Sequence, residues 1–303
     1  MHHKTKINIG TRGSRLALAQ AELFQRALTA ADADVVPETV VIATTGDRLQ
    51  AADAKPDTLT KAVFTKELEE ALLAGAIDVA VHSAKDLPAE LPDGLVIGGV
   101  LCRAAVNDVL VSRAPLTEIV AKPGAVIATG SVRRRRQWLE RYPDTEFLAI
   151  RGNLDTRLRK LREQPAWDGI ILAQAGLERL RPDTDGLTVS VLPVDFVKPA
   201  AGQGAIAIQC AADSAWLPVL RLVTHRPSLV RLRAERAFLR AIGGGCQAPL
   251  GVLARVYDGV CLHLAAVYYA DGAAAGRHAY LTGSALHPEE LGQRLAERVL
   301  AWG

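Results

Sequence analysis

The feature that most constrains the fold of this chain is an alternation, in its first third, of short apolar runs with segments of helical periodicity. Four apolar runs have the length of strands, at residues 6–10, 40–44, 77–81 and 95–101. Apolar residues recur at helical spacing over residues 16–27 and 64–72, and Gly75 is expected to end the second of these helices. This alternation predicts βαβ units around a largely parallel sheet.

The same pattern restarts in the middle of the chain, with strands expected at residues 125–129, 147–150 and 169–173. Helices are expected between them, one running through Arg141 and one over residues 154–162. We therefore expect a second α/β domain, which the chain leaves near Pro193 and Pro199 before a further apolar run at residues 205–210.

The tail has a different order of elements. A helix over residues 230–242 is expected to stop at Gly243, and three strand-like runs follow it, at residues 251–256, 261–269 and 277–282. A last helix is expected over residues 288–302. Successive strands with flanking helices predict a small α+β third domain, so the fold class is α/β with an α+β C-terminal domain.

Composition excludes several classes of protein. A chain of 303 residues suggests two or three domains, and no apolar run has the length needed to span a bilayer. The N-terminus lacks the apolar stretch of a secretory signal, so we expect a cytoplasmic protein. The four cysteines, at 102, 210, 246 and 261, include no Cys-x-x-Cys pair, which favours free thiols and argues against a zinc site. No metal is expected.

The net charge of +3 hides clusters of arginine at residues 133–136, 151–162 and 231–240. The planar guanidinium suits a bidentate grip on carboxylates or phosphates. Aromatic residues are scarce and none interleave with these arginines, as a stacking platform for nucleic acid would require. Small polyanions therefore fit these clusters better than nucleic acid does.

Lys85 and Asp86 follow the carboxyl end of an expected buried strand, in the segment His82-Ser83-Ala84-Lys85-Asp86. Ligands of open α/β sheets bind outside the carboxyl ends of strands. The two residues could form an ordinary ion pair on a surface turn. Alternatively, the carboxylate could hold a cationic intermediate while the ammonium group binds an anionic side chain.

Ser14 and Ser131 each stand in a turn that follows a strand and opens a helix. A helix N-terminus has unpaired N–H groups and the positive end of the dipole, which together can bind an anion. The alternative is ordinary N-capping by the serine hydroxyl, which we expect for at least one of the two.

The run of four arginines at 133–136 cannot share one helix face, because successive helical residues lie about 100° apart. We expect Arg133 and Arg134, nearest the helix N-terminus, to face a cleft, and Arg135 and Arg136 to be solvated. Arg151 lies at the carboxyl end of an expected strand on the same rim. Two further arginines, Arg157 and Arg179, lie on helices, where solvation is the default.

Cys246 lies in the most distinctive segment, Gly243-Gly244-Gly245-Cys246-Gln247-Ala248-Pro249. A loop bounded by glycine and proline makes this thiol accessible, whereas most lone cysteines are buried and inert. No histidine shows a pairing signal with it, which argues against Cys–His catalysis.

Taken together and in this order, these segments resemble the porphobilinogen deaminase (hydroxymethylbilane synthase) family from residue 7 to about residue 255. The residues that carry the resemblance lie at 11–14, 64–68, 85–86, 129–134, 151–158, 175–180, 199–204 and 243–249. Each segment is weakly specific alone, but together and in register they are specific. The tail after about residue 255 matches only in general character.

The resemblance implies two α/β domains like those of periplasmic binding proteins and a small α+β domain. Their expected bounds are 1–102 with 198–220, 103–197, and 221–303. It also implies a dipyrromethane cofactor joined by thioether to Cys246. On that primer the enzyme adds four porphobilinogen molecules, losing ammonia each time, and releases 1-hydroxymethylbilane. We expect a monomer that acts on this small molecule, with no nucleic-acid or membrane partner.

The expected chemistry assigns roles to particular residues. Loss of ammonia leaves an azafulvene-like cation, which the resemblance implies is stabilised by the catalytic Asp86. The growing chain accumulates about a dozen carboxylates, which accounts for an arginine-lined cleft. By motif match, the cofactor would be held by Lys85, Ser131, Arg133 and Arg134. By the same match, substrate would be held by Arg12, Ser14, Arg151, Arg157 and Arg179.

Two departures and two alternatives accompany this interpretation. Lys61 lacks the glycines that often flank it in the family, and Gly130 stands where the family usually has serine. A non-catalytic binding module would bind ligand reversibly and carry no covalent adduct. A nucleic-acid-binding protein would use the 133–136 run and show an affinity that depends steeply on salt.

Overall fold

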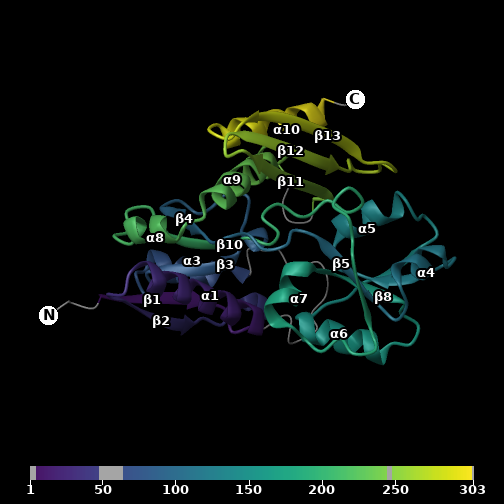
Figure 1. The fold of residues 1–303 in the computed structure, drawn as a ribbon, viewed down its shortest axis with the longest axis horizontal. Helices are drawn as coiled ribbons and strands as arrows, with labels where there is room; N and C mark the ends of the chain where they lie inside the picture. The colour runs from purple at the N-terminus through teal and green to yellow at the C-terminus, as the bar shows by residue number, and fades with distance from the viewer. Residues whose placement is uncertain (1–4, 48–63, 244–247, 302–303) are drawn as a thin grey trace.

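A computed structural model describes residues 5–47, 64–243 and 248–301. They form three parts, each built on its own sheet (Figure 1). Two five-stranded sheets lie side by side at the bottom of the figure, and the third sheet lies above them with two helices. No helix among the described residues has the length and apolar character needed to cross a bilayer.

The first sheet has the strand order β2-β1-β3-β10-β4. Its strands are β1 (Thr5–Thr11), β2 (Val35–Val41), β3 (Val79–Ser83), β4 (Leu95–Val100) and β10 (Ile206–Ala211). Its helices are α1 (Arg15–Ala31), α3 (Lys66–Leu73) and α8 (Leu217–Val223), and the short 3-10 helix η3 (Ala84–Asp86) follows β3. Helices α1 and α8 share a core with one face of the sheet, where Phe24 and Leu220 are fully buried, while α3 packs on the other face through Leu68.

Two expectations for this sheet are corrected. Strands β1, β2 and β3 are parallel, but β10 is antiparallel to both β3 and β4, so the sheet is mixed rather than largely parallel. The second strand spans Val35–Val41 instead of residues 40–44. It is an edge strand paired to β1 alone, so it tolerates Pro37, which has no N–H to donate to a further strand.

The second sheet repeats this arrangement in the order β7-β6-β8-β5-β9. Its strands are β5 (Asp108–Ser112), β6 (Val126–Ala128), β7 (Glu146–Leu148), β8 (Gly169–Ala173) and β9 (Thr188–Val191). Its helices are α4 (Leu116–Ala121), α5 (Val132–Leu139), α6 (Leu154–Glu163) and α7 (Gln174–Leu180). Strands β5 and β9 were not expected from the sequence. In each of the two sheets four strands therefore run in one direction, and one strand is antiparallel to both its neighbours, β10 in the first sheet and β5 in the second.

Both antiparallel strands follow crossovers between the two sheets. The first crossover, residues 101–107, leads into β5, and the second, residues 198–205, leads into β10. The crossovers touch at Gly204, whose φ is +84° and whose added Cβ would lie 2.7 Å from the carbonyl oxygens of Ala104 and Ala105. Only glycine fits this close approach.

The third part is an antiparallel sheet in the order β11-β12-β13, covered by two helices. Its elements are β11 (Leu250–Tyr257), β12 (Cys261–Tyr268), β13 (Arg277–Ser284), α9 (Arg226–Ala241) and α10 (Pro288–Leu300). Phe238, Leu264 and Leu295 are fully buried in the core between helices and sheet. The predicted fold class, two α/β parts and a small α+β part, is confirmed.

A buried ion pair joins this third part to the crossovers. Arg103 of the first crossover donates to both carboxylate oxygens of Glu235 on α9 at 2.8 Å. Glu235 also accepts the backbone N–H groups of Gly202 at 2.7 Å and Ala254 at 2.9 Å. One carboxylate therefore holds both crossovers and β11 together.

Candidate active site

Asp86 lies at the end of η3, where β3 reaches the rim of the first sheet. It is half-buried and lines a pocket together with ten residues from the turn after β1, the start of α1, the two residues before α3, and β3. The walls that matter most are Arg12, Ser14, Gln20, Phe64, His82 and Ser83.

Arg12 is held in this pocket by two contacts. Its guanidinium carbon lies 4.4 Å from the centre of the Phe64 ring, a cation–π contact. Its Nε donates to both oxygens of Asp47 at 3.2 Å. Burial alone would raise the pKa of Asp47, but the hydrogen bonds from Arg12 and Thr44 outweigh it and lower the pKa. Arg12 is therefore positioned before any ligand arrives.

Ser14 is the N-cap of α1, and its hydroxyl accepts the backbone N–H of Ala17 at 3.3 Å. Gln20, one turn further along α1, exchanges hydrogen bonds with Ser83, at 2.8 Å from its Nε2. Gln20 is buried and lines the pocket, and sequence reasoning missed it. The only sign of Gln20 in the sequence is that it is a polar residue within the helix expected over residues 16–27.

His82 forms the buried floor of the pocket. Burial lowers the pKa of His82 to about 4, although Gln209 and the charge of Asp86 act in the opposite direction. The imidazole is therefore neutral at neutral pH.

Arg157, on α6, connects this pocket electrostatically to the second sheet. Its Nε donates to the carbonyl of Gly152 at 2.8 Å. Burial, and next the charge of Arg134, lower the pKa of Arg157 to about 10, although the charge of Asp86 acts in the opposite direction. The structure thus brings Arg12, Ser14 and Asp86 into one pocket, and the charges of Arg157 and Asp86 interact. Arg157 is half-buried, not fully solvated as the helix default suggested.

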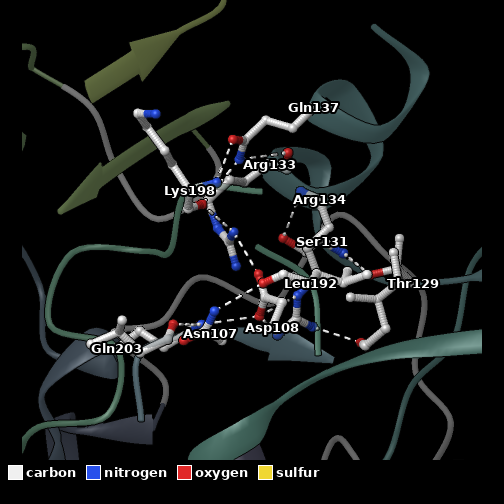
Figure 2. Close-up of polar contacts among 12 residues, drawn as sticks. Asn107, Asp108, Thr129, Ser131, Arg133, Arg134, Gln137, Leu192, Lys198 and Gln203 are labelled. Atoms are coloured by element: carbon white, nitrogen blue, oxygen red, sulfur yellow. Dashed lines mark hydrogen bonds and ion pairs between the residues drawn. The ribbon is translucent and has the colours of Figure 1, made fainter. Parts of the chain in front are cut away.

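A second cluster surrounds Asp108 at the start of β5 (Figure 2). Arg133 donates from Nη1 to Asp108 at 2.8 Å and to the carbonyl of Lys198 at 2.6 Å. Arg134 donates to Asp108 from Nε at 3.1 Å and Nη2 at 2.7 Å, and from Nη1 to Ile171. Burial opposes ionisation, but the two guanidinium groups hold the pKa of Asp108 far below its usual range. Sequence reasoning missed Asp108.

In this cluster the first two arginines of the run 133–136 are buried in ion pairs. Arg133 and Arg134 are each only 6% exposed, so they offer no surface to a nucleic-acid duplex. All three nitrogen atoms of Arg134 are used within the cluster, whereas Arg133 uses Nη1 alone. Ser131 caps α5 by accepting the N–H of Arg134 at 3.4 Å, so N-capping occurs at both serine turns.

The expectation that Arg136 is solvated is wrong, because its side chain contacts the third part. Its Nη1 donates to the carbonyl of Ala273 at 2.9 Å, and its guanidinium carbon lies 5.9 Å from the centre of the Tyr269 ring. The Tyr269 hydroxyl in turn donates to Glu140 at 2.5 Å. The carboxyl end of α5 therefore binds the third part, while Arg135 is exposed as expected.

The remaining predicted residues lie elsewhere or outside the description. Arg179 donates from Nη2 to the carbonyl of Gly204 at 2.7 Å and does not line the Asp86 pocket. Arg151 and Lys85 are half-buried. Cys246 and Lys61 lie outside the described residues, in which Cys102, Cys210 and Cys261 are free thiols.

The fold and the two clusters define a class: two-lobed α/β proteins with a third small domain and cationic groups gathered between the lobes. A family model described as "Porphobilinogen deaminase, dipyromethane cofactor binding domain" matches residues 7–217, and another described as "Porphobilinogen deaminase, C-terminal domain" matches residues 229–301. The chain belongs to the porphobilinogen deaminase family. The match extends through the tail, where the sequence motifs gave only general similarity.

Individual relatives agree with this assignment. A porphobilinogen deaminase of Desulforudis audaxviator is 46% identical over 307 residues, covering 99% of this chain and 96% of its own. That of Rubrobacter xylanophilus is 43% identical and covers 98% and 95%. Among solved structures, the BvgS VFT2 domain of Bordetella pertussis shows a loose likeness of fold, with 15% identity and a TM-score of 0.43 over 72% of this chain and 86% of its own.

Proposed function

We propose that this chain is a hydroxymethylbilane synthase, a transferase that condenses four porphobilinogen molecules, with loss of ammonia, into 1-hydroxymethylbilane. Both family models support the activity, since together they account for nearly the whole chain. The observation that carries the mechanism is the Asp86 carboxylate, which lines a pocket with Arg12 and lies within electrostatic reach of Arg157.

Asp86 is the proposed catalytic residue. Its carboxylate stands where positive charge develops when the substrate loses ammonia, and a fixed negative charge there stabilises the transition state. His82, neutral at neutral pH, adds no opposing charge beneath it. The pyrrole N–H of the substrate donates to the same carboxylate.

The donor set fits a primer that carries several carboxylates. Guanidinium groups from both lobes and the N-terminus of α5 supply charge-assisted donors, and Nε and Nη2 of Arg133 form no hydrogen bond with a described residue. The proposed holders of a dipyrromethane are Lys85, Ser131, Arg133 and Arg134, with Cys246 as its covalent attachment. When bound, this group supplies the pyrrole carbon to which the first substrate unit is joined.

The carboxylates of porphobilinogen and of the growing chain would be gripped by Arg12, Ser14, Arg151, Arg157 and Arg179. Bidentate pairing with guanidinium fixes each ring in orientation as well as in position. We further propose the domain bounds 1–102 with 198–220, 103–197 and 221–303, a monomeric state and a cytoplasmic location.

The direct test is turnover. Purified protein should consume porphobilinogen and release ammonia and a linear tetrapyrrole in a ratio of four substrates to one product. Reversible binding of porphobilinogen without consumption would contradict the proposal and favour a binding module of the same fold.

A further inference from the structure

A large cavity lies at the junction of the two lobes, on the side of the crossovers. It has a volume of about 860 Å³ and is bounded by α1, the first crossover, α7, β10 and the turn before α9. We name it the hinge cavity and define it by Leu23, Cys102, Arg179, Arg181, Ile206 and Val223.

The hinge cavity is separate from the Asp86 pocket, since the two share no lining residue. Both use α1, but the Asp86 pocket is lined mainly by the start of that helix and the hinge cavity by residues further along it. Ala17 and Gln20 face the Asp86 pocket, whereas Leu23 and Ala27 face the hinge cavity.

The size and the walls of the hinge cavity suit a small organic molecule. Binding pockets for such molecules commonly measure roughly 300–1,000 Å³ and are mostly apolar, with a few placed polar groups. Here the apolar wall comes from Leu23, Leu101, Ile206 and Val223. An occupant would touch α1 of the first lobe and α7 of the second at once.

Among the charged groups of the wall, the guanidinium group of Arg181 is available to a ligand. Arg26 is paired with Glu22 at 3.1 Å on α1. Arg179 donates one hydrogen bond to the Gly204 carbonyl, and neither it nor Arg181 forms an ion pair with a described carboxylate. The remaining carboxylate, Glu178, accepts a hydrogen bond from Gln174 at 2.8 Å.

The backbone of Arg181 adds an independent observation. This residue ends α7 in the left-handed region, with a φ of +43°, a conformation that glycine or asparagine adopts at lower cost. Its side chain is exposed, so no packing requirement explains an arginine there. A strained backbone that presents a cation to a cavity points to a use for that cation.

We propose that the hinge cavity is a second binding site, for a small molecule with an apolar body and a carboxylate held by Arg181. Binding would add a contact between the two lobes and so stabilise this arrangement of the domains. This site would exist whatever reaction the Asp86 pocket performs.

Cys102 can report binding in the hinge cavity directly, because this exposed thiol lies in its wall. The probe is naphthylacetate, and naphthylethanol is its uncharged analogue. The rate of alkylation of each cysteine by iodoacetamide is followed by mass spectrometry of peptides. Naphthylacetate should slow alkylation of Cys102 saturably and leave Cys261, which is half-buried in the third part, unaffected. Naphthylethanol should protect Cys102 much less.

Matched variants test the role of the charge. Arg181→Ala should raise the concentration for half-protection about tenfold, the loss of one charge-assisted hydrogen bond, and Arg181→Lys should restore part of it. Arg221→Ala, at an exposed arginine of α8 outside the cavity, should change nothing. The proposal is overturned if Cys102 is not protected, if the alcohol protects equally, or if Arg181→Ala binds as well as the parent.

Discussion

Arg134 and Asp108 form a buried ion pair in which Nε and Nη2 of the arginine donate to one carboxylate oxygen at 3.1 and 2.7 Å. The pair joins α5 to β5, the strand that enters the second lobe from the first crossover. Arg133 binds the other oxygen and the carbonyl of Lys198 in the second crossover. The same cluster therefore fixes both the N-terminus of α5 and the connection between the lobes (Figure 2).

Asp108→Asn should lower the free energy of unfolding by about 3–5 kcal/mol, because two guanidinium groups would remain buried without a counter-charge. Urea unfolding of variant and parent measures the difference. Asp195→Asn, at a side chain that is 92% exposed, is the matched control and should unfold like the parent. The pKa of Asp108 is lowered in the folded state, so its contribution is present above pH of about 4 and lost below it. An effect of the variant that persists unchanged at pH 2 would contradict this account.

His82 should make the protein less stable between pH 6.5 and 4. The pKa of His82 is about 4 in the folded state and about 6.5 in the unfolded chain, so the unfolded chain binds the proton first as the pH falls. The loss from this residue alone is on the order of 3 kcal/mol across that window. Thermal or urea unfolding as a function of pH measures it. His82→Gln should remove this part of the acid dependence, and His287→Gln, at an exposed histidine, should retain it.

Arg136→Ala should cost about 1 kcal/mol of stability, since it removes a hydrogen bond to Ala273 and a cation–π contact with Tyr269. Arg135→Ala, at the exposed neighbour, should be silent in the same urea titration. Equal stability of the two variants would show that the contact between α5 and the third part contributes nothing.

Asp86→Asn should fold with the stability of the parent but lose a factor of about 100–1000 in turnover, because the amide keeps the shape and loses the charge. Porphobilinogen consumption and thermal unfolding are measured on the same preparation. Glu90→Gln, an exposed carboxylate four residues further on, should keep full activity. Turnover of Asp86→Asn within a few-fold of the parent would remove Asp86 from the mechanism.

The sequence predicted those features that depend on residues close together in the chain. The strand at residues 169–173 and the N-caps at Ser14 and Ser131 follow from periodicity and capping propensity, and the structure contains them. β5 was missed, although Val109, Leu110 and Val111 are apolar, because three apolar residues beside a charged one give no clear period.

Contacts between distant segments could not be predicted in this way. Asp108 meets Arg133 and Arg134 only because β5 enters the second sheet antiparallel to β8, after the crossover. The contact of Arg136 with Ala273 joins residues 137 positions apart and depends on how α5 meets the third part. The positions of residues 132–139 around their own helix therefore could not predict the contact between Arg136 and Ala273.

The central claim is that this chain carries a covalent dipyrromethane on Cys246 and elongates it. Intact-mass measurement of the purified protein, followed by peptide mapping, tests it most directly. The account predicts a mass above that of the 32.3 kDa chain by two pyrrole units, located on the peptide that contains Cys246, and a Cys246→Ser variant that folds at the bare mass without activity. A parent protein at the bare mass, or an adduct on Cys102, Cys210 or Cys261, would contradict it.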